Sequence, residues 1–305
     1  MFKLLLSMTA FMMCYAASAA DAPSGDVRLV DKAEKVTITW AVNPAPPFHI
    51  FEGKYASQGI GDVMLNSIIA HMPEAKHTIV RMPHSRISKR VDADMNLCFP
   101  CLIKRSRSSK WIYSNANVEY LPLGVIALPE TIAPFLDSDG RVSFKHLVEN
   151  SQLTFAKPVA RKYPDVMQTI VESAKGNPRF ETIAGADSAT RVLNQLKYGR
   201  IDFTLEYPAI LTYLTRTEGE SKLQYYYTTE LGEAPIPGAV GCTNNAWGAN
   251  VIERVNEALN AIVDTPDYRA SQALWLSPYS LRDKAPAVII SSHGVEAGNV
   301  PNANP

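Results

Sequence analysis

Basic residues gather in one stretch of a chain that is otherwise electrically balanced. Residues 76–110 contain nine Lys or Arg and two Asp, an excess of seven positive charges, whereas the 305 residues together hold 30 basic and 30 acidic side chains. Arginine offers a planar fork of N–H donors that fits a carboxylate or phosphate. The stretch therefore predicts either a solvated face or an anion-binding site. The balanced net charge gives no electrostatic case for nucleic acid as a partner.

The cysteines offer a second kind of chemistry. Cys98-Phe-Pro-Cys101 is a C-x-x-C motif, and Cys242 follows far along the chain. A redox pair needs a helix N-terminus to lower a thiol pKa, but residues 94–103 predict a strand. A zinc site needs about four ligands, and no second C-x-x-C or H-x₃₋₅-H occurs. We expect instead a disulfide from Cys98 or from Cys101 to Cys242, and the sequence does not choose between them.

Catalytic signatures are absent from the sequence. No G-x-S-x-G, S-x-x-K or H-E-x-x-H occurs, and the six histidines are scattered. Gly59-x-Gly61 lacks the third Gly and the downstream acid of a dinucleotide fingerprint. We therefore expect no metal, no cofactor and no enzymatic activity. Catalytic groups can also converge from distant positions, so an enzyme stays open as an alternative.

Strand and helix patterns alternate along the chain and must position these residues. β-branched and apolar alternation predicts strands at residues 36–42, 78–82, 94–103, 118–128 (broken at Pro122), 152–156, 201–205 and 238–242. Helical periodicity predicts helices that open near residues 59, 163, 188 and 249, the second with Val166, Met167, Ile170 and Val171 facing inward. This alternation is typical of α/β proteins.

The first twenty residues predict a cleaved signal peptide. Lys3 precedes an apolar run over residues 4–15, and Ala17-Ser18-Ala19 supplies the small residues of a cleavage site near Ala19 or Ala20. The run is shorter than the roughly 20 residues of a membrane span. We therefore expect a periplasmic protein, in which a disulfide is permissible. Residues 277–305, rich in Pro, Ser, Gly and Asn, predict a disordered tail.

Four stretches, in this order, resemble the family 3 extracellular solute-binding proteins, the receptors of polar amino-acid ABC transporters. The resemblance covers about residues 35–276. The stretches are Thr39-Trp40-Ala41 through Pro46-Pro47-Phe48 to Gln58-Gly59-Ile60-Gly61-Asp62; Ile103-Lys104-Arg105-Ser106-Arg107 with Trp111-Ile112-Tyr113-Ser114; Leu196-Lys197-Tyr198-Gly199-Arg200-Ile201-Asp202; and Val240 to Val263 followed by Tyr268 and Trp275.

The resemblance implies the two-lobed type II periplasmic-binding-protein fold of α/β class, with two crossing hinge strands. It places residues 35–120 and 233–276 in lobe 1 and residues 121–232 in lobe 2. Such lobes close around a ligand by a hinge motion. The implied partners are a small-molecule ligand and an ABC permease or membrane sensor, and the implied state is a monomer.

The resemblance also assigns first-lobe site residues. Arg107 aligns with the arginine that grips a ligand carboxylate in this family, and Lys104 stands where the family usually has Thr or Ser. Phe48 and Trp40 would line the first-lobe wall of the cleft. For Trp40 an ordinary core position is an equal expectation.

The second lobe departs from the family pattern. Tyr207 falls where the amino-acid binders carry an Asp for the ligand amine. Glu206 beside it could replace that acid, but neighbours on a strand face opposite sides. This departure predicts a more anionic ligand than a standard α-amino acid. Two alternatives stay open: an interaction module whose cleft no longer binds ligand, and a periplasmic dehydratase-like enzyme with Glu206 over the cleft.

Overall fold

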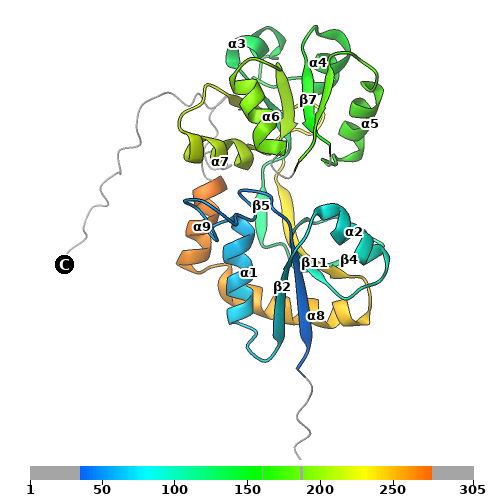
Figure 1. Ribbon diagram of the computed structural model, residues 1–305, viewed down its shortest axis with the longest axis vertical. Helices are drawn as coiled ribbons and strands as arrows, with labels where there is room; N and C mark the ends of the chain where they lie inside the picture. The colour runs from blue at the N-terminus through cyan, green and yellow to red at the C-terminus, as the bar shows by residue number, and fades with distance from the viewer. Residues whose placement is uncertain (1–34, 160, 186–187, 277–305) are drawn as a thin grey trace, which may run out of the picture. The chain divides into compact units, whose positions relative to one another are not determined.

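The computed structural model describes residues 35–159, 161–185 and 188–276. Strands and helices alternate through these residues and form two sheets with flanking helices (Figure 1). The predicted signal peptide and the predicted C-terminal tail lie outside the described residues. Within them, no helix is long and apolar enough to cross a membrane.

The first sheet combines strands from both ends of the described chain. Its order is β2-β1-β3-β11-β4, and β5 pairs with β11 beside that path. Strand β1 runs parallel to β2 and β3, whereas β11 is antiparallel to β3, β4 and β5. The strands are β1 (Thr37–Val42), β2 (Lys76–Arg81), β3 (Cys98–Ile103), β4 (Trp111–Tyr113), β5 (Val118–Tyr120) and β11 (Ile236–Thr243).

Helices α1 (Ile60–Ala70) and α8 (Ala246–Ile262) bury one face of this sheet, and α2 (His84–Asp92) packs on the other. Their apolar residues recur at helical spacing, as predicted for the helices that open near residues 59 and 249. Ile68 of α1 and Val255 of α8 share one core cluster, whereas Ile87 of α2 packs with Phe99 of β3 in another. Helix α9 (Pro266–Leu276) follows α8 and packs near α1 and α7.

The second sheet has the order β10-β6-β9-β7-β8. Strand β7 is parallel to β8 and β9, and β6 is antiparallel to β9 and β10. Its strands are β6 (Gly124–Ala127), β7 (Phe155–Pro158), β8 (Phe180–Ile183), β9 (Phe203–Glu206) and β10 (Gln224–Tyr226). Its helices are α3 (Pro129–Ile132), the 3₁₀ turn η1 (Ala133–Phe135), α4 (Phe144–Asn150), α5 (Asp165–Ser173), α6 (Ser188–Lys197) and α7 (Pro208–Glu218).

The second sheet is buried on both faces. Along β6, Val125 and Ala127 belong to the cluster under α4 and α5, whereas Ile126 belongs to the cluster under α6 and α7. This alternation follows from the two-residue period of a strand. Burial on both faces explains why β6 is a continuous apolar run, Gly-Val-Ile-Ala.

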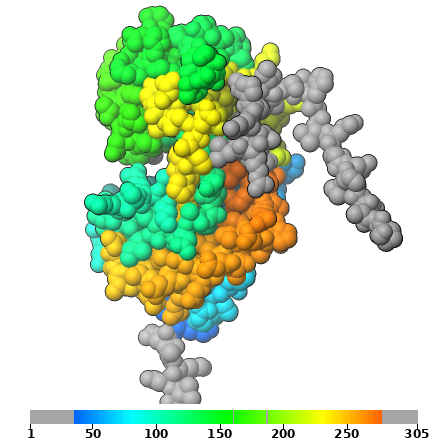
Figure 2. Space-filling model, turned by 180° about the vertical axis from the view of Figure 1, so that it is seen from behind, coloured from blue at the N-terminus to red at the C-terminus, as the bar shows by residue number. Residues whose placement is uncertain are grey.

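Two chain segments connect the sheets. The chain leaves the first sheet after β5 and returns to it with β11, and Tyr120 and Ile236 are paired where these strands run side by side. Figure 2 shows the returning segment in yellow, on the face opposite to Figure 1. The predicted break at Pro122 is confirmed, but the run 118–128 forms two strands, β5 and β6, rather than one interrupted strand.

The predicted inward orientation of Val166 is wrong, and its helix begins later than predicted. Val166 of α5 is 48% exposed, whereas Met167, Ile170 and Val171 are buried as expected. The helix begins at Asp165, two residues after the predicted start, which leaves Val166 on its first, solvated turn. Gly199 follows α6 with φ +63°, the left-handed conformation that a glycine adopts after a helix end.

Candidate functional site

A basic loop follows β3 and borders an open pocket. The pocket has a volume of about 600 Å³ and is lined by residues 105–109 and 111–113 with Asn244. Arg105 and Arg107 are exposed there, and among the described residues neither forms a salt bridge. The loop is held by the Ser108 hydroxyl, which accepts the N–H groups of Lys110 and Trp111 at 3.2 and 3.0 Å. It presents two guanidinium groups that no described acid neutralises.

Lys104 stands at the base of this loop with its ammonium group already engaged. Its Nζ donates to the backbone oxygen of Ser114 at 2.7 Å. The Ser114 hydroxyl in turn accepts the N–H of Val240 in β11 at 3.0 Å. Lys104 is absent from the lining of the 600 Å³ pocket. Its contacts tie the loop to the first sheet.

A buried ion pair lies at the carboxyl ends of β9 and β7 in the second sheet. Glu206 ends β9 and is 2% exposed, and Arg161 follows β7 and is 24% exposed. Arg161 directs Nε and Nη2 to one oxygen of Glu206, at 3.0 and 2.5 Å. The other oxygen accepts the backbone N–H of Tyr207 at 2.9 Å. Burial alone would lower the pKa of Arg161, but the Glu206 carboxylate together with Tyr163 and Tyr207 outweighs it, and the pKa is raised.

Tyr207 links this pair to aromatic residues of the other sheet. Tyr207 precedes α7, and its ring lies 5.9 Å from the Arg161 guanidinium. On another side, its ring centroid is 6.4 Å from that of Phe48, which also contacts Tyr120 at 5.5 Å. Burial raises the pKa of Tyr207 to about 12, while the positive charges of Arg161 and Arg105 act in the opposite direction. The basic loop and the ion pair therefore act on the same side chain.

His84 brings a further titratable group to this region. It begins α2, is exposed at its surface, and packs edge-on against Phe99 at 5.8 Å between ring centroids. The surrounding protein displaces part of the solvent around the ring and lowers the pKa of His84, and the positive charge of Arg161 lowers it further. His84 of the first sheet and Arg161 of the second thus interact electrostatically.

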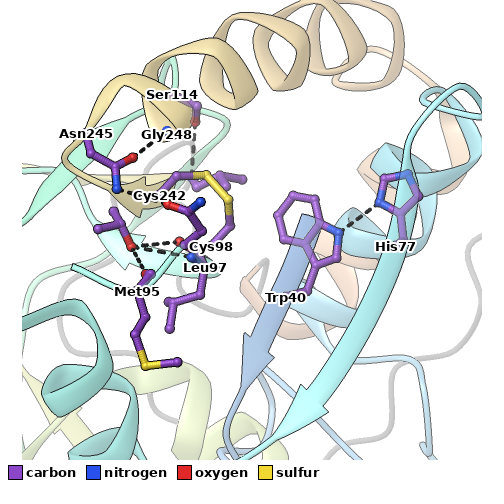
Figure 3. Close-up of a disulfide and its surroundings, with 12 residues drawn as sticks. Trp40, His77, Met95, Leu97, Cys98, Ser114, Cys242, Asn245 and Gly248 are labelled. Atoms are coloured by element: carbon purple, nitrogen blue, oxygen red, sulfur yellow. Dashed lines mark hydrogen bonds between the residues drawn. A yellow bond between two sulfur atoms is a disulfide. The ribbon is translucent and has the colours of Figure 1, made fainter. Parts of the chain in front are cut away.

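Trp40 belongs to the core and presents no surface to a ligand. It is 0% exposed in β1, and its indole Nε1 donates to Nδ1 of His77 at 3.0 Å (Figure 3). Nε2 of His77 lies 2.9 Å from the backbone oxygen of Met72. Since a carbonyl only accepts, Nε2 carries the proton and Nδ1 is the acceptor for Trp40. The structure therefore places Trp40 at the second of its two expected positions, not in the cleft wall.

Cys98 and Cys242 form a disulfide in the core of the first sheet. The two residues are directly paired between β3 and β11, and Figure 3 shows the bond joining those strands. Cys98 and not Cys101 is therefore the partner of Cys242, which the sequence left open, and Cys101 keeps a free thiol. Between Phe99 and Leu102, β3 has one residue more than β11, a bulge that contains Pro100. Burial raises the pKa of Cys101 far above its ordinary value.

The glycines and acid near residue 60 have a structural role. Asp62 accepts the N–H groups of Ile50 and Gly59 at 2.8 and 3.1 Å and contacts Nδ1 of the buried His49 at 2.9 Å. A Cβ on Gly61 would lie 2.4 Å from Sγ of Cys101. Glycine is therefore required by close packing, which explains Gly-x-Gly-Asp without a nucleotide. No three described His, Cys, Asp or Glu side chains converge as a metal site.

Three residues of this region were not predicted as site residues. Arg161 lies outside every motif, and His84 lies within the basic stretch without being counted in it. Arg105 was counted in that stretch and also stands in the Ile103-to-Arg107 segment that carries the resemblance, but neither gave it a role. The structure brings Arg161 to the predicted Glu206 and Tyr207, and brings Phe48 and Arg105 near Tyr207. Arg107 lies with Arg105 at the pocket. The available signal was a basic residue within three positions of the end of β3 and of β7, namely Arg105 and Arg161.

Comparisons with known proteins give a fold and no closer relationship. No known family model matches the chain, and no curated protein matches it. An ancestral arginine-binding protein bound to arginine has a TM-score of 0.57 at 12% identity, over 79% of this chain and 98% of that one. A histidine kinase sensor domain with similarity to periplasmic binding proteins has 0.56 at 13%, over 81% and 97%.

A third similar structure is the probable amino-acid ABC transporter extracellular-binding protein YtmK of Bacillus subtilis. Its TM-score is 0.55 at 18% identity, over 80% of this chain and 98% of that one. At these identities the likeness is one of fold. The chain therefore has the α/β type II periplasmic-binding-protein fold, with the strands β5 and β11 at the two crossings between its sheets.

Proposed function

We propose that this chain is an exported, monomeric solute-binding protein that closes around a small, polar, carboxylate-bearing ligand. Its lobes would be residues 35–120 with 233–276, and residues 121–232. It would pass its ligand to an ABC transporter or report it to a membrane sensor. The solved structures of similar fold support this role, since those named above are an arginine-binding protein, a probable extracellular-binding protein of an amino-acid ABC transporter and a sensor domain.

The observation that carries the proposal is the meeting of both sheets around Tyr207. Arg161 and Glu206 reach it from the second sheet, whereas Phe48 touches it from the first. Arg105 acts on the same ring and lines the pocket that also holds Arg107. Aromatic faces beside unneutralised guanidinium groups suit a small carboxylate, because Arg binds it in a forked geometry. Hinge closure of two such lobes would bury that ligand.

The test is a thermal-shift screen of the protein purified after export. The panel holds amino acids, mono- and dicarboxylates, inorganic phosphate, sugars and polyamines. A ligand at 100 times its dissociation constant adds about 2.7 kcal/mol to the free energy of unfolding. For a chain of this size, the melting temperature then rises by about 5–10 °C.

Two variants separate specific binding from a general salt effect. Arg107→Ala should abolish the shift given by a carboxylate ligand. Arg269→Ala is the matched control. Arg269 is an exposed arginine of α9, and its salt-bridge partner Asp264 precedes that helix. A folded protein whose melting temperature no panel member raises would contradict the proposed function.

A further inference from the structure

Glu206 is in no position to accept an ammonium group. It is 2% exposed, and both carboxylate oxygens have partners within the protein. Arg161 occupies one oxygen with two N–H groups, and the backbone N–H of Tyr207 occupies the other. The Glu206 carboxylate is almost completely buried and its charge is already neutralised by Arg161, so a ligand ammonium would find neither an open approach to it nor an unpaired charge. The acid beside Tyr207 is therefore a structural partner of Arg161.

Arg161 keeps donors for a second contact. A guanidinium carries five N–H groups, and Glu206 engages Nε and Nη2 only. Nη1 has no hydrogen bond to any described residue, although the side chain is 24% exposed. With one edge held by a buried carboxylate, the guanidinium is fixed in orientation, and its open edge can donate to an anion.

The charges around this edge are positive. The charged side chains that act on Tyr207 are Arg161, Glu206 and Arg105. Burial lowers the pKa of His84 in α2 and of the buried Lys157 in β7, and the positive charge of Arg161 lowers both further, while Glu172 acts in the opposite direction on Lys157. Glu206 is the one carboxylate among the described charges that act on Arg161, Tyr207 and His84. Since the ion pair is neutral, Arg105 remains as an uncompensated positive charge that acts on Tyr207, and Arg107 lines the same pocket as Arg105.

We infer that the ligand of this site is a small dianion without an ammonium group, with one anionic group held by the open edge of Arg161. This inference rests on the proposed function and names its ligand class. Glu206 acts as a positioning residue that orients Arg161, and the exposed Arg105 and Arg107 balance the two negative charges. Dicarboxylates and phosphate share this chemistry, and the experiment distinguishes them.

The first experiment uses ligand pairs that differ only by the α-ammonium group. Calorimetric titration of the exported protein compares succinate with aspartate, glutarate with glutamate, and includes inorganic phosphate. We expect one dianion to bind at least tenfold more tightly than its amino-acid counterpart, and the dicarboxylates and phosphate report which anion is preferred. Equal or tighter binding of aspartate or glutamate would overturn the inference and leave the proposed function intact.

Other outcomes separate the two proposals. Binding of a sugar or polyamine, with no dianion bound, would also overturn the inference and keep a solute-binding role. No binding by any member of the earlier panel to a folded protein would reject both.

The second experiment assigns the contact to Arg161. Arg161→Gln should reduce the affinity for the bound dianion at least tenfold. The affinity for the monoanionic analogue of that ligand, for example butyrate where the dianion is succinate, should stay nearly unchanged. Arg161→Lys keeps the charge and the partner of Glu206, and should keep the preference for the dianion at lower affinity. Equal losses for monoanion and dianion in a variant that is still folded at the temperature of the titration would contradict the role of Arg161.

Discussion

Removing the Cys98–Cys242 disulfide should lower the free energy of unfolding by several kcal/mol. The bond joins residues 144 positions apart, so in the unfolded chain it closes a loop that contains the entire second sheet. The chain-entropy relation for a loop of that length gives about 5 kcal/mol at 25 °C. For a protein of this size, the melting temperature should fall by about 10–20 °C.

The double variant Cys98→Ala/Cys242→Ala is the suitable perturbation. Both side chains are fully buried, so a single substitution would leave an unpaired thiol in the core. Urea unfolding measures the loss, and wild-type protein reduced with dithiothreitol should show a comparable loss. Cys101→Ala is the matched control from the same strand, and should change stability far less because Cys101 closes no loop.

Two results would refute this reasoning. A loss below about 1 kcal/mol in the double variant would mean that the bridge does not constrain the unfolded chain as the loop length requires. A peptide map of the non-reduced protein that joins Cys101 to Cys242 would contradict the pairing itself. The expected map joins Cys98 to Cys242 and finds Cys101 alkylated only after unfolding.

The ion pair, the His84 ring and the Cys101 thiol give three further expectations. Arg161→Met should cost about 3–5 kcal/mol in urea unfolding because it leaves Glu206 buried and unpaired, whereas Arg161→Met/Glu206→Leu should recover most of that loss; equal losses would argue against the pair. Because the pKa of His84 is lowered in the folded protein, the unfolded chain binds more protons below about pH 6.5, so unfolding free energy should fall as pH decreases there, and His84→Gln should flatten the fall. Since burial raises the pKa of Cys101, iodoacetamide at pH 8 should label it slowly in folded protein and rapidly in urea; equal rates would contradict its burial.

Periodicity identified most of the strands and most of the long helices of the two sheets, because each buries a regular face, whereas the short strands β4, β8 and β10 were not predicted. Ile68 of α1 and Met167 of α5 are buried as their spacing predicts. The break at Pro122 separates β5 from β6, since proline supplies no N–H to a ladder. Helix α2 was missed because it is short and mostly charged, and only Ile87 and Val91 are buried in it. A basic stretch thus concealed an amphipathic helix.

Single residues were harder to place than elements. Trp40 belongs to a motif that the resemblance assigns to the wall of a ligand cleft. Its strand, however, lies between β2 and β3 and is covered by helices on both faces. The strand alternation that separated Glu206 from Tyr207 also had a limit, because β9 ends at Glu206 and Tyr207 is the cap of α7. The backbone N–H of Tyr207 can therefore turn back to its neighbour's carboxylate.

The pairing of Arg161 with Glu206 depends on strand order, which periodicity does not report. The two residues are 45 positions apart, but β7 and β9 are parallel neighbours with Phe155 opposite Phe203. The carboxyl ends of parallel neighbours meet at one edge of a sheet, and helix N-termini and ligands meet there too. Read along the chain, Glu206 looks like a free acid that could bind an amine. Read across the sheet, it is neutralised by an arginine that follows the adjacent strand. A free Glu206 would favour a ligand with an ammonium group, whereas Glu206 paired with Arg161 leaves a guanidinium edge that favours an anion. The pairing of β7 with β9 decides between these two ligand classes.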